Sequence, residues 1–153
     1  MAQLLAIARR KRSRAPMETL DSISVSLERG IDGDFRGKPG RRQVTVLSQQ
    51  GWQAACDEVG HSLAWTIRRA NLLIDGLSFG PELSGQWLWI GEVALQISYE
   101  CDPCPRMDEQ APGLTAALTP DWRGGLCCRV VRPGVIRVGD EVRLNAAEQQ
   151  TPA

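Results

Sequence analysis

The sequence predicts a mainly β fold, a β-barrel or closed sheet with a few short helices. Short segments in which apolar and polar residues alternate recur along the chain, and glycine or proline separates them. Such a pattern is typical of strands joined by tight turns. A helical period is clear in one segment, so helices are expected to be few. The 153 residues are enough for one domain with a substantial core.

The first part of the chain holds three expected strands, at Gln3 to Ala8, Ile23 to Leu27 and Gln43 to Leu47. A basic run from Arg9 to Arg14 follows the first strand. Its charge alone favours a solvated hairpin arm, and an anion clamp of guanidinium groups is the alternative. Four glycines lie between Gly30 and Gly40. This segment is interpreted either as a long hairpin loop or as a backbone nest for an oxyanion.

A helix is expected to begin after Ser48 and to end at Val59. Ser48 is a favourable N-cap, and Gly60 stands where a left-handed residue often ends a helix. Apolar residues spaced i, i+3, i+4 and i+7 form one face, which includes Cys56. Cys56 is therefore predicted to pack in the core. His61, just beyond the helix, is expected at the surface.

The rest of the chain predicts a hairpin, one short helix and three more strands. Arg68 to Gly76 is interpreted as leading into a loop around Pro81. The hairpin pairs Gln86 to Ile90 with Val93 to Tyr99. The helix is expected at Gly113 to Leu118, and the strands at Leu126 to Val131, Val135 to Val138 and Glu141 to Leu144. Residues 1–145 are predicted to form a single domain, followed by a disordered tail at 146–153.

Composition narrows the possible functions. The chain has 18 basic and 18 acidic residues, so no net attraction to nucleic acid or to a membrane surface is expected. It has no apolar run long enough to span a membrane, and its first apolar patch precedes the basic residues, the reverse of a signal peptide. A cytoplasmic protein is therefore expected. Five cysteines favour free thiols over a disulfide scaffold, and the single histidine excludes a multi-histidine metal site.

The strongest chemical signal is the loop Cys101-Asp102-Pro103-Cys104-Pro105, after the strand ending at Tyr99. Prolines on both sides of Cys104 fix φ and remove backbone donors, so a thiol there would stand on a stiff loop. A thioredoxin-like site is disfavoured because alternating strands and helices are missing. A four-cysteine zinc site is disfavoured because Cys127 and Cys128 should point to opposite faces of a strand, one buried and one exposed. One reactive cysteine remains, with a purely structural loop as the alternative.

Five short motifs follow one another along the chain. They are Gly33-Asp34-Phe35-Arg36, Arg42-Gln43-Val44-Thr45, Arg69-Ala70-Asn71-Leu72, Pro103-Cys104 and Gly134-Val135-Ile136-Arg137-Val138-Gly139-Asp140. In this order and spacing they resemble MOSC domains, named for the C-terminal domain of eukaryotic molybdenum cofactor sulfurases. The resemblance covers nearly the whole chain, from Gln3 to Leu144. It implies a MOSC-like β-barrel with a cleft for the molybdenum cofactor, molybdopterin.

The resemblance also implies roles for particular residues. The hallmark cysteine matches Cys104, which in the family is a metal ligand or is proposed to carry a sulfane sulfur. The implied cofactor-binding residues, with the arginines and the glycine turn holding the pterin phosphate, are Asp34, Arg36, Arg42, Arg69, Asn71 and Arg106. Asp34 suits bracing of its own loop nearly as well as ligand contact. Cys101 departs from the family pattern and is predicted to resolve a persulfide on Cys104. Pyridoxal phosphate is not expected in this chain.

Three functions stay open. The favoured one is a molybdenum-cofactor-binding protein that carries or transfers sulfur through Cys104, with a cysteine desulfurase or a molybdoenzyme acceptor as partner. The second is a molybdenum-cofactor-dependent reductase of N-hydroxylated compounds, which would need external electron carriers. The third is a non-catalytic module with a structural cysteine loop. The short chain, without a redox partner of its own, favours the first.

Overall fold

The computed structural model describes residues 2–145, so the tail predicted at 146–153 lies outside the described part. The strands are β1 (Gln3–Arg9), β2 (Glu18–Leu20), β3 (Ser22–Ser26), β4 (Gly30–Ile31), β5 (Val44–Ser48), β6 (Leu72–Asp75), β7 (Trp87–Ile90), β8 (Val93–Glu100), β9 (Leu126–Arg132), β10 (Gly134–Arg137) and β11 (Val142–Asn145). The α-helices are α1 (Gln49–Val59) and α2 (Leu114–Leu118). Four 3-10 helices are η1 (Trp65–Arg68), η2 (Pro81–Leu83), η3 (Pro105–Glu109) and η4 (Pro120–Trp122). Within residues 2–145, no helix combines the length and apolar character needed to cross a membrane.

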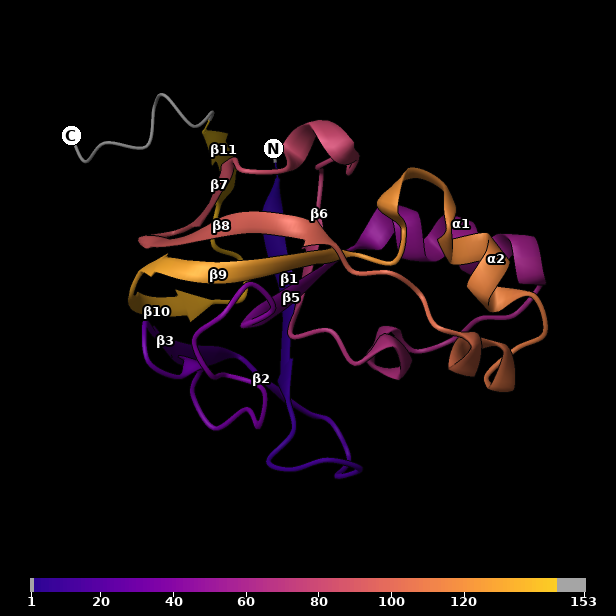
Figure 1. Cartoon of the computed structure of the whole chain (residues 1–153), viewed down its shortest axis with the longest axis horizontal. Helices are drawn as coiled ribbons and strands as arrows, with labels where there is room; N and C mark the ends of the chain where they lie inside the picture. The colour runs from indigo at the N-terminus through magenta and orange to yellow at the C-terminus, as the bar shows by residue number, and fades with distance from the viewer. Residues whose placement is uncertain (1, 146–153) are drawn as a thin grey trace.

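The predicted mainly β class is confirmed, whereas the predicted closed barrel is wrong for residues 2–145. The strands form an eight-stranded sheet, ordered β11-β7-β8-β9-β5-β6-β1-β2, and a three-stranded sheet, ordered β10-β3-β4 (Figure 1). The edge of β1 that faces β2 is shared between two partners, because only Ile7 to Arg9 pair with β2. On the same edge, Gln3 and Leu4 contact the segment before β11. Gln3 forms a bridge with Glu141, and Leu4 forms backbone hydrogen bonds with this segment. These contacts bring the ends of the sheet together without a continuous ladder.

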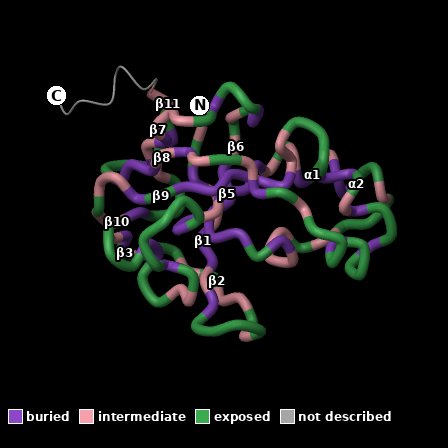
Figure 2. The backbone as a smooth tube through the Cα atoms, viewed as in Figure 1, coloured by how far each residue is buried: buried purple, intermediate pink, exposed green. Residues whose placement is uncertain are grey.

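Two apolar cores lie on opposite faces of the central strands. Leu72 and Ile74 of β6 pack in the core between the sheets, while Leu73 packs under the helices with Leu47 of β5. The helices α1 and α2 lie together beside one end of the larger sheet (Figure 1), and buried residues run along the central strands (Figure 2). The strands β5 and β6 pair in parallel, and parallel strands need a crossover connection and cover on both faces. Here α1 belongs to that crossover.

The helix prediction at Ser48 is confirmed. Ser48 Oγ accepts a hydrogen bond of 3.3 Å from the backbone N–H of Gly51, and Gly60 ends α1 with a φ of 72°. Cys56 is buried on the inner face of this helix, as predicted.

The prediction that one of Cys127 and Cys128 is exposed is wrong, because both are fully buried. In the sheet, β9 lies between β8 and β5. Cys128 belongs to the core between the sheets, while the Cys127 thiol meets Cys101 at the start of the cysteine loop. That loop therefore covers the face of β9 that the sequence left open to solvent.

Candidate functional site

A cleft of about 660 Å³ is lined by residues from the β1–β2 loop, the loop before β5, the η1–β6 connection and the cysteine loop. All eight residues that the sequence singled out lie along it, namely Asp34, Arg36, Arg42, Arg69, Asn71, Cys101, Cys104 and Arg106. The fold thus joins side chains that are far apart in sequence.

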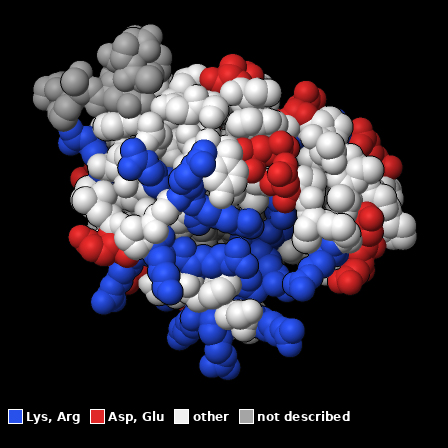
Figure 3. All heavy atoms as spheres, viewed as in Figure 1, with Lys and Arg blue, Asp and Glu red and all other residues white. Residues whose placement is uncertain are grey.

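The cleft is strongly cationic although the chain has no net charge. Seven of its lining residues are arginines, Arg10, Arg14, Arg36, Arg42, Arg68, Arg69 and Arg106, whereas two are acidic, Asp34 and Glu109. Lysine and arginine side chains gather across the centre and lower part of the face shown in Figure 3. Clustered positive charge in a concave site concentrates anions. The geometry therefore favours an anionic ligand.

Asp34 braces the glycine-rich loop that carries it. Its Oδ1 accepts a hydrogen bond of 3.1 Å from the backbone N–H of Arg10, and its Oδ2 accepts one of 3.3 Å from that of Arg36. The backbone N–H of Phe35 donates in turn to the carbonyl of Arg10. Both carboxylate oxygens therefore hold backbone, so Asp34 fixes the loop against the end of β1.

Gln43 anchors the other end of the same loop and is 2% exposed. Its Nε2 donates to the carbonyls of Leu27 and Gly37, and its Oε1 accepts from the backbone N–H of Val130. One buried amide thus joins three backbone segments, which gives the neighbouring Arg42 a defined place at the cleft. Gln43 belongs to a motif that the sequence analysis used, but its anchoring role was not anticipated.

Asn71 lines the cleft with a side chain whose polar atoms already have partners. Its Oδ1 accepts from the backbone N–H of Thr45 at 3.1 Å, and its Nδ2 donates to the carbonyl of Ala8 at 3.3 Å. Asn71 therefore ties the start of β6 to β5 and β1. Its geometry is that of a brace beneath the cleft, while its predicted contact with a cofactor remains a prediction.

Arg68 and Arg69 occupy different environments because the chain turns between them. Arg69 adopts a left-handed conformation with a φ of 62° at the end of η1 and is exposed at the cleft. Arg68 is buried, and its guanidinium donates to the carbonyls of Gly124, Cys101 and Asp102 at 3.0, 2.8 and 3.1 Å. Arg68 therefore holds the cysteine loop in place.

Cys104 presents its thiol on the stiff loop that the prolines predicted. It is the exposed cysteine, whereas the other four cysteines are buried. Its carbonyl accepts hydrogen bonds from the backbone N–H of Met107 and from Thr115 Oγ1, which tie the loop to η3 and α2. The sulfur thus lies at the cleft on a backbone that is fixed on both sides.

Cys101, three residues earlier, is buried and electrostatically activated. A hydrogen bond from the Cys127 thiol, with help from Arg68 and Arg42, lowers the pKa of Cys101 to about 6, against the opposing effects of burial and Asp102. Arg68 Nη2 lies 3.5 Å from Cys101 Sγ. The same hydrogen bond raises the pKa of Cys127, and burial raises that of Cys128. The cleft therefore holds a buried cysteine with a lowered pKa, Cys101, three residues before the exposed Cys104.

The thiolate absorbance of the native protein is expected to fall as the pH is lowered through about 6, because Cys101 takes up a proton there. Ultraviolet titration measures this change. In Cys101→Ser the step should be missing, whereas Cys56→Ser, which alters a buried thiol of α1, should retain it. A step that survives in Cys101→Ser would assign the thiolate to another cysteine.

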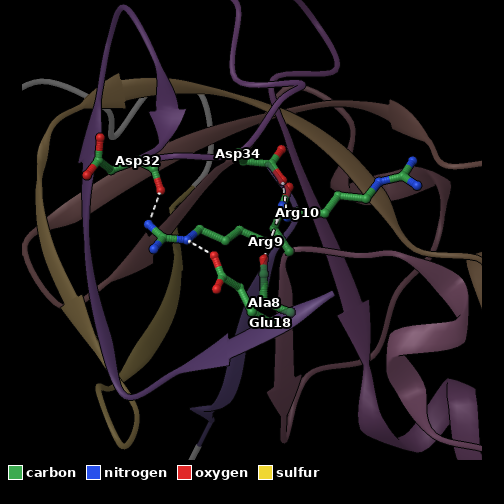
Figure 4. Close-up of polar contacts among 7 residues, drawn as sticks. Ala8, Arg9, Arg10, Glu18, Asp32 and Asp34 are labelled. Carbon is green, nitrogen blue, oxygen red and sulfur yellow. Dashed lines mark hydrogen bonds and ion pairs between the residues drawn. The ribbon is translucent and has the colours of Figure 1, made fainter. Parts of the chain in front are cut away.

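Sequence reasoning missed two arginines that shape the cleft. Arg68 directly precedes Arg69, but nothing local shows that it is buried against a loop more than thirty residues away. Arg10 belongs to the basic run for which an anion clamp was the less favoured interpretation. Its neighbour Arg9 pairs with Glu18 instead, at 2.8 Å. Arg9 thus stays within the hairpin (Figure 4), whereas Arg10 lines the cleft and its anion-clamp interpretation remains a prediction.

The fold and the cleft define a mainly β domain with a thiol-bearing, arginine-lined pocket. The family model of the MOSC domain matches residues 32–143, so the chain belongs to the MOSC domain family. This family is associated with the molybdenum cofactor.

Solved structures agree with this fold. The YuaD protein of Bacillus subtilis is 21% identical with a TM-score of 0.73, over 94% of this chain and 96% of that one. YiiM of Geobacillus stearothermophilus is 17% identical with a TM-score of 0.76, over 95% of this chain and 76% of that one. YiiM of Escherichia coli is 16% identical with a TM-score of 0.69, over 94% and 70%. No curated protein matched the chain.

Proposed function

We propose that this domain binds the molybdenum cofactor and carries sulfur on Cys104. The supporting observation is that the exposed Cys104, the buried Cys101 with its lowered pKa and an arginine cluster share one cleft. A pocket of this kind offers both a sulfur nucleophile and a positively charged binding site for an anionic ligand.

The donor set of the cleft fits such a cofactor. A cysteine thiolate is a soft ligand suited to a dithiolene-bound metal, and arginines suit the phosphate of a pterin. Within residues 2–145, no group of three or more His, Cys, Asp or Glu is placed to hold a metal ion. Cys104 would therefore hold the metal from the protein side, as a soft thiolate ligand at the cleft. When bound, the cofactor would supply a redox-active metal.

Cys104 is proposed to receive its sulfur from a donor persulfide, such as that of a cysteine desulfurase. The Cys104 thiolate attacks the outer sulfur, the donor S–S bond breaks, and the donor leaves as a thiolate that takes up a proton. The product is a persulfide on Cys104. Exposure of Cys104 lets a partner protein reach it, and the rigid loop holds the loaded sulfur over the cleft.

Cys101 is proposed to release that sulfur. Its thiolate attacks the inner sulfur of the Cys104 persulfide, so a Cys101–Cys104 disulfide forms and hydrosulfide leaves toward an acceptor. A thiol reductant then restores the two cysteines. The low pKa of Cys101 keeps the attacking thiolate available at neutral pH, and Arg68 holds it in place.

Cys104→Ser is expected to abolish sulfur loading, because the accepting nucleophile is lost. Cys101→Ser should load normally but keep its persulfide, because the resolving thiolate is missing, whereas the loaded native protein should release hydrosulfide and form the Cys101–Cys104 disulfide before any thiol is added. Purified protein is incubated with a cysteine desulfurase and cysteine, and added sulfur on the Cys104 peptide is measured by mass spectrometry. The control is Cys56→Ser, which should load and release as the native protein does.

A native protein that takes up no sulfur would reject the carrier function. The same exposed thiol also suits a metal ligand in a reductase that receives electrons from an external carrier. Reduction of an N-hydroxylated compound by cofactor-loaded protein, with a chemical electron donor, would then decide for that second function. Loss of that activity in Cys104→Ser would link it to the same residue.

A further inference from the structure

The outer face of the strands β11, β7, β8 and β9 carries two tryptophans that belong to neither of the two apolar cores. Trp87 and Trp89 alternate along β7 with Leu88 and Ile90, which are fully buried in the core between the sheets. Both tryptophans are half-buried, and the alternation of a strand points them to the other side of the sheet. Their ring centres lie 6.0 Å apart, at an interplanar angle of 52°. The strand β7 therefore presents a pair of indoles away from its core.

Arginines from the neighbouring strands lie around this pair. The register places Arg143 of β11 opposite Trp89, and it places Arg132 of β9 opposite Ala94, the residue of β8 that pairs with Trp89. Directly paired residues project from the same face of a sheet. The guanidinium carbons of Arg143 and Arg132 lie 5.4 and 5.7 Å from the centre of the Trp89 ring. Contact with an aromatic ring orients a guanidinium and leaves its N–H edge for hydrogen bonds.

Positive charge on this face is largely uncompensated. Arg129 of β9 donates to Gln96 Oε1 at 2.8 Å, and a neutral amide leaves the charge in place. Glu141 approaches Arg143 at 3.7 Å, but both side chains are about half exposed, and such a pair contributes little. Within residues 2–145, Arg129 and Arg132 form no ion pair. Lysine and arginine side chains accordingly lie over β8 and β9 in Figure 3.

This surface is separate from the cleft, because none of its side chains lines the cleft that holds Cys104. Tryptophan and arginine are enriched among the residues that supply most of the binding energy at protein–protein interfaces. Here the two residue types alternate across neighbouring strands with little opposing charge. The surface is called the tryptophan face below, and it consists of Trp87, Trp89, Arg129, Arg132 and Arg143.

We propose that the tryptophan face docks an acidic segment of a partner protein. A carboxylate accepts two parallel hydrogen bonds from the forked edge of an arginine, and apolar side chains of the same segment pack on the indoles. Single-stranded nucleic acid fits less well. Two guanidinium groups already stand over the Trp89 ring, and the tilt between the Trp87 and Trp89 rings gives successive bases no common flat platform. This docking goes beyond the proposed function and is independent of the thiol chemistry.

The test is fluorescence anisotropy at constant ionic strength with fluorescein-labelled probes. These are a peptide of glutamates around a central leucine, the same peptide with glutamine in place of glutamate, and an oligothymidylate of equal charge. Native protein should bind the glutamate peptide at least about tenfold more tightly than the glutamine peptide. Arg132→Glu should weaken that binding by about tenfold or more, because a repelling carboxylate replaces a guanidinium donor. Arg143→Glu, at an exposed position, should do the same.

Two exposed arginines outside the tryptophan face provide matched controls. Arg12→Glu alters the basic run and Arg36→Glu alters the cleft. Each should weaken binding of the glutamate peptide by less than about threefold, because charges far from the bound segment are screened. Hydroxyl-radical footprinting locates the peptide. It should protect Trp87 and Trp89, but not Trp122, which is half-buried elsewhere in the fold.

Equal affinity for the two peptides, or equal weakening by Arg12→Glu and Arg132→Glu, would overturn the proposal, because general surface charge would then explain the binding. A larger loss in Arg36→Glu would place the peptide in the cleft, and tighter binding of the oligothymidylate through Arg132 would make this a nucleic-acid surface. Either result rejects the acidic segment. Circular dichroism establishes that Arg132→Glu is folded, and Arg143→Glu tests the face at an exposed position. Failure of the proposed function looks different, since native protein would then bind the glutamate peptide yet take up no sulfur on Cys104.

Discussion

Arg68→Met is expected to destabilise the domain by about 3–5 kcal/mol, because it removes a buried charged donor on which the cysteine loop depends. Three carbonyls lose their partner, those of Gly124, Cys101 and Asp102. A buried acceptor left without a donor costs about 1–3 kcal/mol. Urea denaturation followed by circular dichroism measures the loss. The pKa of Cys101 should also rise, since Arg68 is one of the charges that lower it.

Two further variants make this result specific. Arg68→Lys should fall between the native protein and Arg68→Met, because an ammonium keeps the charge but lacks the planar fork of donors. Arg129→Met removes an exposed arginine that donates to Gln96 at 2.8 Å and should change stability by less than about 1 kcal/mol. An Arg68→Met protein as stable as Arg129→Met would show that the cysteine loop holds itself in place.

Gly37→Ala is expected to cost about 3 kcal/mol or more, because the added methyl has no room. A Cβ at Gly37 would lie 1.7 Å from the backbone carbonyl oxygen of Arg29, so backbone must move. The Gly37 carbonyl accepts from Gln43 Nε2, and the same loop carries Asp34 and Arg36. Thermal or urea denaturation measures the stability.

Gly51→Ala provides a control with the opposite sign. Gly51 lies in the first turn of α1, where a Cβ would make an ordinary contact of 3.4 Å with Arg123. Alanine there should stabilise the protein by about 0.5–1 kcal/mol, since glycine is a poor helix former. Equal losses for the two variants would mean that any alanine is harmful, and that the loop carrying Gly37 has no special role.

Elements defined by local patterns were predictable from the sequence. In the β7–β8 hairpin, Val93, Leu95, Ile97 and Tyr99 alternate with smaller or polar residues, and α1 carries its own caps at Ser48 and Gly60. Cys104 stood out because two flanking prolines limit its backbone. In each case the deciding residues lie within a few positions of the feature that they determine.

Features set by distant contacts were not predictable in the same way. The strand β6 was interpreted as part of a segment that leads into a loop, because Leu72 to Ile74 are apolar on both faces and show no alternation. Burial of both Cys127 and Cys128 depends on neighbours on the two faces of β9. Arg10 and Arg68 look alike in sequence. Only the fold shows that Arg68 donates to three carbonyls, whereas Nη1 of Arg10 has no partner within residues 2–145.

The central position of β5 has a consequence for the order in which the chain folds. Val46 of β5 pairs with Leu72 of β6 on one side and with Leu126 of β9 on the other. Pairing between strands that are distant in sequence is slow, and a domain generally folds as a unit. The sheet is therefore expected to close around β5 only once β9 is available. The backbone N–H of Val130 in β9 donates to Gln43, and that of Cys101 donates to the carbonyl of Gly125 just before β9. The glycine-rich loop and the cysteine loop should thus take their places together, so that the cationic side and the thiol side of the cleft form in one step.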